Sequence, residues 1–143
     1  MQNGRSRFLI LAGAALWCIA IAAAPALRSA FQFHAIYDFF SQICHQDPAR
    51  SWMVGGEPLP VCIRCACIYF GFFLGCLFGL RPNLRLLQVA VASTIGEFIL
   101  ARVLLDSAWL RGASGLFLGA VAAPFVILGV HEMLETRFRR DAV

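Results

Sequence analysis

Long apolar runs broken by short polar segments dominate the pattern of this chain. Four of these runs are about 20 residues long, the length at which an α-helix crosses the hydrocarbon core of a bilayer. They predict spanning helices over residues 8–27, 61–80, 84–105 and 113–134. Residues 28–60 form the one long segment between spans, and we predict that they lie outside the bilayer on one side of it.

The first half of this loop carries a helical pattern of its own. Its apolar residues fall on one face at helical spacing, whereas Asp38 and Gln42 lie off that face. The face consists of Phe33, Ile36, Tyr37, Phe40 and Cys44. The pattern predicts a helix over Ser29–Cys44 at the membrane interface or against the bundle, with a continuation of the first span as the alternative.

Proline, glycine and polar residues predict the breaks between elements. Asp47-Pro48 is typical of a helix start and indicates one or two turns through Trp52. Gly55 and Gly56, followed by Pro58 and Pro60, predict a turn. We further expect Arg81-Pro82-Asn83 to end the second span and residues 106–112 to form a short polar turn.

Glycines recur at every fourth position in two of the predicted spans. They are Gly71, Gly75 and Gly79 in the second span, and Gly115 and Gly119 in the fourth. A helix face without side chains lets another helix approach closely, which is how helices pack inside a membrane. We expect these faces to contact a neighbouring helix, and they offer a surface for a homo-oligomer or a membrane partner.

The composition agrees with this pattern. Of 143 residues, 60% are hydrophobic and 14% are charged, and the mean hydropathy is +0.75. Soluble domains carry roughly a quarter charged residues. We therefore predict a single all-α domain over residues 1–143, an integral membrane bundle of four transmembrane helices with a folded-back outer loop. A cleavable signal peptide is the alternative to the first span, because Ala20-Ile21-Ala22 has the small-x-small pattern of a cleavage site.

The arginines set the expected orientation, because cytoplasmic loops of membrane proteins carry the excess of basic residues. One side carries Arg5, Arg7, Arg81, Arg85, Arg137, Arg139 and Arg140. The other carries Arg28, Arg50 and Arg111, with Arg64 and Arg102 near the ends of spans. This bias predicts that both termini are cytoplasmic and that residues 28–60 lie outside. The expected partner is the lipid bilayer and not a nucleic acid, since no basic patch is present.

Three cysteines and a histidine gather in the loop and at the start of the second predicted span. Cys44-His45 and Cys62-Ile63-Arg64-Cys65 have the ligand types of a zinc site, in which two cysteines separated by two residues form a knuckle. We predict a site for zinc or another transition metal, with Cys44, Cys62 and Cys65 as ligands and His45 as the preferred fourth ligand.

The fourth ligand is the open part of this prediction. Adjacent residues of an extended chain point in opposite directions, so Cys44 and His45 reach one ion only through a local turn. Other candidates for the fourth ligand are His34, Asp47 and Cys67. We expect Arg50 and Arg64 to hold the surrounding loop through backbone carbonyls or through Asp47 and Glu57.

Redox chemistry is the second interpretation of the same cysteines. At the start of a helix and beside Arg64, the helix dipole and the guanidinium both favour a thiolate. Cys62 and Cys65, with Cys44, would then form a thiol–disulfide oxidoreductase with a quinone as cofactor. This arrangement resembles disulfide-generating membrane oxidoreductases and vitamin K epoxide reductase, which use an additional cysteine pair. A structural disulfide is the third interpretation.

Charged residues also fall in or beside the third predicted span. Glu97 lies near its middle, and Arg102 and Asp106 are four residues apart on one helix face, with Arg111 beyond them. A carboxylate at this depth faces the bundle interior or water. Glu97 is then an internal partner for Arg102 or Arg64, or a neutral acid bonded to Ser93 or Thr94. The functional alternative is a proton or cation site of the kind found in a small ion or metal transporter.

The cysteine segment resembles a known family. Cys44-His45-Gln46-x-Pro48-x-Arg50-Ser51, followed by Pro60-Val61-Cys62-x-Arg64-Cys65, is similar to the signature of DUF2085, a family of small prokaryotic membrane proteins. Asp106, Arg111, Gly115 and Gly119 resemble a second block of that family. Ala66-Cys67 departs from the expected Thr-Gly. The resemblance implies a multi-pass protein of a prokaryotic inner membrane, and it implies no activity.

Overall fold

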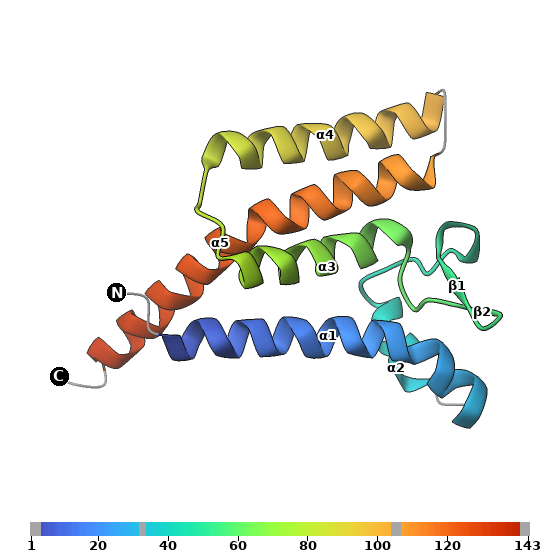
Figure 1. Ribbon diagram of the computed structural model, residues 1–143, viewed down its shortest axis with the longest axis horizontal. Coiled ribbons are helices and arrows are strands. Elements are labelled where there is room, and N and C mark those ends of the chain that lie inside the picture. The colour runs from blue at the N-terminus through green and yellow to red at the C-terminus, as the bar shows by residue number, and fades with distance from the viewer. Residues whose placement is uncertain (1–3, 32–33, 104–106, 141–143) are drawn as a thin grey trace.

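The computed structural model describes residues 4–31, 34–103 and 107–140, and most of this part of the chain is helical (Figure 1). The helices are α1 (Gly4–Phe31), α2 (Ala35–Ser41), α3 (Ile63–Phe78), α4 (Leu84–Val103) and α5 (Ala108–Arg140). Between α2 and α3 lie a short 3-10 helix, Pro48–Arg50, and a hairpin of β1 (Met53–Val54) and β2 (Glu57–Pro58). The prediction of a mostly helical chain is confirmed.

Among the described residues, three helices are long and apolar enough to cross a membrane. They are Arg7–Ser29 in α1, Leu84–Val103 in α4 and Ala108–Met133 in α5. α3 is also apolar but has 16 residues, which is about 24 Å of helix at 1.5 Å per residue. The hydrocarbon core of a bilayer is about 30 Å thick, so the second predicted span is shorter than residues 61–80 suggested.

Backbone conformation and one arginine determine where α3 begins and ends. Cys62 is extended (φ −66°, ψ 160°) and caps the N-terminus. Gly79 is left-handed (φ 62°) and caps the C-terminus, a conformation that favours glycine. Arg7 of α1 donates hydrogen bonds of 3.2 Å to the carbonyls of Cys76 and Leu77 in the last turn. The start of α1 therefore lies beside the end of α3. The arginine pattern predicts that this end of the molecule is cytoplasmic.

α3 and α5 form the centre of the molecule, with α1 against α3 and α4 against α5 (Figure 1). Four of the five repeated glycines lie between these two helices, whereas Gly79 faces Arg7 of α1. A side chain at Gly71 would collide with the carbonyl of Leu116, and one at Gly119 would collide with the carbonyl of Ile68. Gly75 and Gly115 meet the facing helix in the same way. These glycines therefore pack helices of the same chain, and a homo-oligomer would need another face.

The helix predicted over Ser29–Cys44 has different bounds. α1 continues through Pro25 to Phe31, and α2 begins only at Ala35. The predicted apolar face is otherwise present, because Tyr37, Phe40 and Cys44 are buried. Phe33 lies outside the described residues.

The polar turn predicted at residues 106–112 is wrong over its second part. α5 begins at Ala108, and the backbone N–H of Arg111 donates to the carbonyl of Ser107 at 3.1 Å. Arg111 is buried and not solvated. A polar side chain that points into the bundle is compatible with a helix. The polarity of Arg111 is therefore no sign of a turn.

The segment between α2 and α3 contains the predicted turn and a hairpin that was not predicted. Gly55 and Gly56 have positive φ values of 61° and 86° and reverse the chain between β1 and β2, as two-residue hairpin turns require. The side chain of Asp47 accepts a hydrogen bond of 3.0 Å from the backbone N–H of Ala49, so the predicted cap is confirmed. The helix that follows ends at Arg50 and does not reach Trp52.

Candidate metal centre

Cys62 and Cys65 occupy the start of α3. Cys62 is the N-cap residue, and Cys65 follows in the first turn. The carbonyl of Cys62 accepts a hydrogen bond of 3.0 Å from the N–H of Ala66, which closes this turn. Residues three apart lie on the same face of a helix, so both thiols can point toward one position.

Cys44 comes to the same position from the loop. It follows α2, and its N–H donates a hydrogen bond of 2.9 Å to the carbonyl of Phe40. Its Sγ accepts a hydrogen bond of 3.2 Å from the backbone N–H of Cys62. This contact joins the backbone at the start of α3 to the thiol of the loop cysteine.

The ligand atoms of Cys44, Cys62 and Cys65 all lie within 4.8 Å of one another. All three residues are free cysteines. A tetrahedral zinc site has Zn–S distances of about 2.3 Å, which places its sulfurs about 3.8 Å apart. The three thiols therefore converge to nearly the separation that three corners of such a tetrahedron require.

Hydrogen bonding sets the acidity of Cys62. The thiol of Cys65 donates to its sulfur, and further hydrogen bonds come from the Cys65 backbone and from the thiol of Cys44. Burial opposes them, but together they lower the pKa of Cys62 from 9.0 to about 5. Cys62 is then a thiolate at neutral pH, the form that binds a metal ion.

A small apolar core surrounds the three thiols. Cys44 is buried in a cluster with Phe40, Leu59 and Val61, and Cys62 and Cys65 pack against it. Trp17 of α1 and Tyr69 of α3 pack against the same cluster. The site is therefore enclosed on its protein side by side chains from α1, α2, α3 and the loop.

The other predicted ligands lie apart from this group. His45 is exposed, and the three converging ligand atoms do not include it. His34 is exposed and caps α2 without a side-chain hydrogen bond. Asp47 caps the 3-10 helix, and Cys67 is buried outside the group. His45 as fourth ligand stays a prediction.

The two predicted supporting arginines have different partners. Arg50 lies 3.4 Å from the carboxylate of Asp47, as expected for a residue that stabilises the loop. Arg64 points away from the cysteines and pairs with Glu97 of α4. Glu57 pairs with Arg28 instead, at 3.2 Å.

Glu97 lies at the junction of three helices. Its carboxylate is buried, contacts Arg64 of α3 and lies 4.0 Å from Nε of Arg111 of α5. The interpretation of Glu97 as an internal ion partner therefore fits Arg64, whereas the pairing with Arg111 was not predicted. Arg102 is exposed and lies 5.2 Å above the ring of Phe98. Asp106, its predicted partner, lies outside the described residues.

Three residues that fasten the loop were missed at the sequence level. The hydroxyl of Tyr37 donates to the carbonyl of Pro58 at 2.7 Å, and Nε2 of Gln46 donates to the carbonyl of Tyr37 at 2.6 Å. Arg28 lies 4.7 Å above the ring of Tyr37. Only the place of Gln46 beside Cys44-His45 could have drawn attention to this network, since spacing along the chain does not show which loop segments meet.

Comparisons with known proteins agree with the motif. The family model described as "Predicted membrane protein (DUF2085)" matches residues 44–138. Over 40 residues, the chain is 45% identical to an uncharacterised protein of Methanocaldococcus jannaschii, a match that covers 28% of this chain and 26% of that protein. No solved structure matches. Because the family model covers more than half of its length, the chain belongs to the DUF2085 family of predicted membrane proteins.

Proposed function

We propose that this chain is a metal-binding membrane protein whose site holds zinc or a similar transition metal between Cys44, Cys62 and Cys65. The observation that carries this proposal is the convergence of three free thiols within 4.8 Å from two segments of the chain. Thiolates select zinc and related ions. The low pKa of Cys62 supplies one thiolate at neutral pH, and the charge of the ion would favour the other two.

The metal would have an accessory, structural role in this proposal. The loop contains only a three-residue 3-10 helix and strands of two residues, and a hairpin of this size has little stability of its own. Cys44 belongs to the loop, whereas Cys62 and Cys65 belong to α3. One ion bound to all three would fix the loop on the bundle. His45 can complete the coordination through a movement of its exposed side chain.

The membrane arrangement is part of the same proposal. Four helices, α1, α3, α4 and α5, would cross a prokaryotic inner membrane, with both termini in the cytoplasm and the cysteines outside. α3 is too short to span alone, and the loop packed at its N-terminus would supply the missing thickness. In a chain whose own cysteines have been replaced, a cysteine introduced at position 55 should react with an impermeant thiol reagent in intact cells, whereas one at position 83 should not.

Elemental analysis with a thiol count tests the metal. We expect one metal ion per chain and three thiols that react only after chelation. Cys65→Asp should keep partial binding, because a carboxylate can replace sulfur, and Cys65→Ser should lose most of it. Protein without stoichiometric metal that contains a Cys62–Cys65 or Cys44–Cys62 bond would overturn the proposal.

A thiol–disulfide oxidoreductase is the second candidate, and the low pKa of Cys62 at a helix N-terminus favours it. The two functions differ in the oxidation state that the cysteines must have. A metal site requires all three thiols to be reduced, whereas the redox function requires Cys62 and Cys65 to alternate with a disulfide. Chelator should change the stability of the protein in the first case, and reductant should change it in the second.

A further inference from the structure

Three consecutive apolar side chains are exposed at the hairpin of the loop. Trp52 precedes β1, and Met53 and Val54 form it, with exposed fractions of 48%, 59% and 48%. We call these three residues the β1 patch. The facing strand β2 is half-buried, and Glu57 in it pairs with Arg28. Removal of apolar surface from water is favourable, so the β1 patch is a surface that gains stability from an apolar partner.

The β1 patch borders two apolar grooves of the bundle. Trp52 lines one groove together with Phe70 of α3 and Trp109 of α5. Trp52 and Val54 line the other with Phe70 and with Ile21 of α1. Figure 1 shows the hairpin beside the end of the bundle where α3 begins. The exposed side chains of the patch therefore lie next to apolar side chains of α1, α3 and α5.

The neighbouring helices indicate which partner covers the patch. α1 and α5 are long and apolar enough to cross a membrane, and the chain belongs to a family of predicted membrane proteins. Phe70 of α3 and Leu116 of α5 are exposed, and Trp109 in the first turn of α5 is 89% exposed. In a membrane, lipid covers such side chains. The β1 patch is therefore continuous with a surface that lipid covers.

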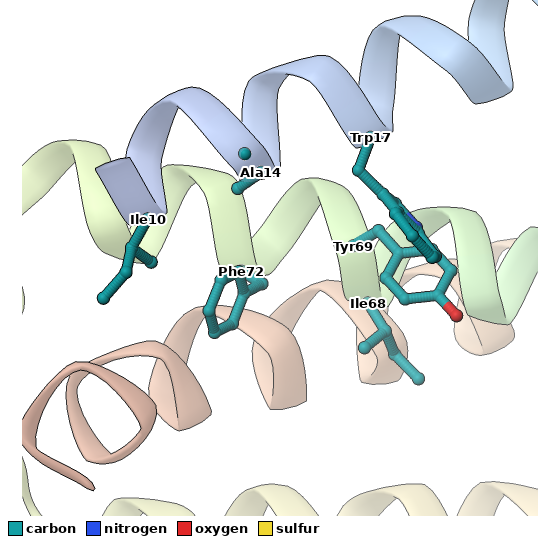
Figure 2. Close-up of a pocket in the computed structure, with 7 residues that line it drawn as sticks. Ile10, Ala14, Trp17, Ile68, Tyr69 and Phe72 are labelled. Carbon is teal, nitrogen blue, oxygen red and sulfur yellow. The ribbon is translucent and has the colours of Figure 1, made fainter. Parts of the chain in front are cut away.

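The three tryptophans of the chain support this interpretation. Trp17 packs edge-to-face on Tyr69 between α1 and α3, at a centroid distance of 5.6 Å, and Figure 2 shows the two rings together. Trp52 and Trp109 lie instead at the surface, in the loop and at the start of a candidate span. Tryptophan at the surface near the end of a span is typical of the membrane interface, where its apolar ring and polar N–H both find suitable surroundings.

We infer that the β1 patch docks on the phospholipid bilayer, in the interfacial layer on the side of the cysteine site. The hairpin lies along the membrane surface, and Trp52 and Trp109 are at the boundary between the headgroups and the acyl chains. Apolar side chains in this position enter the membrane by about 5–10 Å. The backbone of β1 pairs with β2, and the carbonyl of Trp52 accepts a hydrogen bond of 2.8 Å from the N–H of Leu59. This pairing lowers the cost of bringing the strand into a less polar layer.

This contact would also act on the cysteine site, through the backbone of the loop. Leu59, which donates to Trp52, is buried in the same cluster as Cys44 and Val61. Lipid beneath β1 would therefore hold the loop on the bundle at a second place, whether or not an ion is bound. The inference does not rest on the metal proposal, and its test is separate from the test of the metal.

The first experiment measures the depth of Trp52. The full-length Trp17→Phe/Trp109→Phe protein, in vesicles of phosphatidylcholine and phosphatidylglycerol, retains Trp52 as its one tryptophan. Bromines near the headgroup end of the acyl chains should quench its fluorescence about twofold more than bromines near the chain ends, because an interfacial ring lies close to the headgroups. Quenching by aqueous acrylamide alone would place Trp52 in water and overturn the inference. Quenching by neither would mean that protein, such as a second copy of the chain, covers Trp52, and would overturn it as well.

The second experiment adds one carboxylate at either of two exposed positions. Met53 and Ala49 are both exposed residues of the loop, but Ala49 belongs to the 3-10 helix and not to the β1 patch. In the same single-tryptophan protein, Met53→Asp should lower the quenching of Trp52 by brominated lipid about threefold, because a charge opposes entry into the apolar layer. Ala49→Asp should leave the quenching unchanged. Equal quenching in both variants and their parent would show that the patch does not enter the membrane.

A further variant keeps the test decisive if Met53→Asp does not fold. Val54→Ser removes apolar surface from the patch without adding a charge. The quenching of Trp52 by brominated lipid should fall about twofold, since less apolar area favours contact with the acyl chains. Undiminished quenching in a folded Val54→Ser protein would contradict the inference.

Discussion

The α3–α5 pair and the cysteine loop are held together by different means. Between the helices, glycines allow one backbone to touch the other, as at Gly71 and Gly119, over most of the length of α3. In the loop, single side chains make the fastening contacts, such as those of Tyr37 and Gln46. The helix pair is therefore held by its own backbone contacts, whereas the loop, under the proposed function, would gain its full stability only when an ion binds the three thiols.

The largest effect should come from closing the space between α3 and α5. Gly119→Leu places a side chain where the backbone of Ile68 lies, and a backbone cannot move aside as a flexible side chain can. We expect loss of the folded protein, measured by size-exclusion chromatography and thermal unfolding. Gly96→Leu is the control, since a Cβ at Gly96 meets nothing within 4 Å. A folded Gly119→Leu protein of parental stability would show that these helices do not pack through their glycines.

Glu97 links the helices of the bundle through ionic contacts, whereas the glycines link them through close backbone contacts. Glu97→Leu removes the carboxylate that Arg64 contacts, and loss of one partner of a buried ion pair costs about 3–5 kcal/mol of unfolding free energy. Glu97→Gln keeps a hydrogen-bond acceptor and should lose much less. Arg102→Leu is the control, because Arg102 is exposed. Chemical denaturation in micelles measures all three, and equal losses for Leu and Gln would mean that charge alone matters.

Chelation should affect the loop more than the bundle. Removal of the ion should expose Cys44, Cys62 and Cys65 to alkylation and should lower the thermal stability by less than Glu97→Leu does, because α3 and α5 keep their contacts. Limited proteolysis should then cut near Gly55 and Gly56, where the chain is exposed. Reductant alone should change neither result. If chelator unfolded the whole protein, the bundle would depend on the site and the two regions would not be separable.

The sequence predicted the bundle better than the site, for physical reasons. Glycines at every fourth position and runs of apolar residues are local patterns, so they indicated the close helix faces and the positions of α1, α3, α4 and α5. The convergence of Cys44 with Cys62 and Cys65 was also predictable, since the ligand types and the spacing limit the possible partners.

Contacts that depend on the folded loop were not predictable in this way. The partner of Arg64 is Glu97 and not a loop residue, because the side chain at the third position of Cys62-Ile63-Arg64-Cys65 projects from α3 toward α4. The sequence prediction placed Arg111 in a polar turn, because the local pattern does not show its buried partner Glu97. The direction of a side chain from a helix decides both cases, and that direction follows from helix packing.

The smallest effect should come from the hydroxyl of Tyr37. Tyr37→Phe removes the hydrogen bond to the carbonyl of Pro58 but keeps the ring beneath Arg28. The loss of one such bond costs about 1 kcal/mol, and we expect it to appear as faster alkylation of the cysteines in chelated protein with little change in the thermal unfolding of the bundle. Tyr69→Phe is the matched control, because no hydrogen bond of the Tyr69 hydroxyl occurs among the described residues. If the cysteines were alkylated at the same rate in both variants, the loop would be fastened by packing around Phe40 and Val61 and not by its side-chain hydrogen bonds.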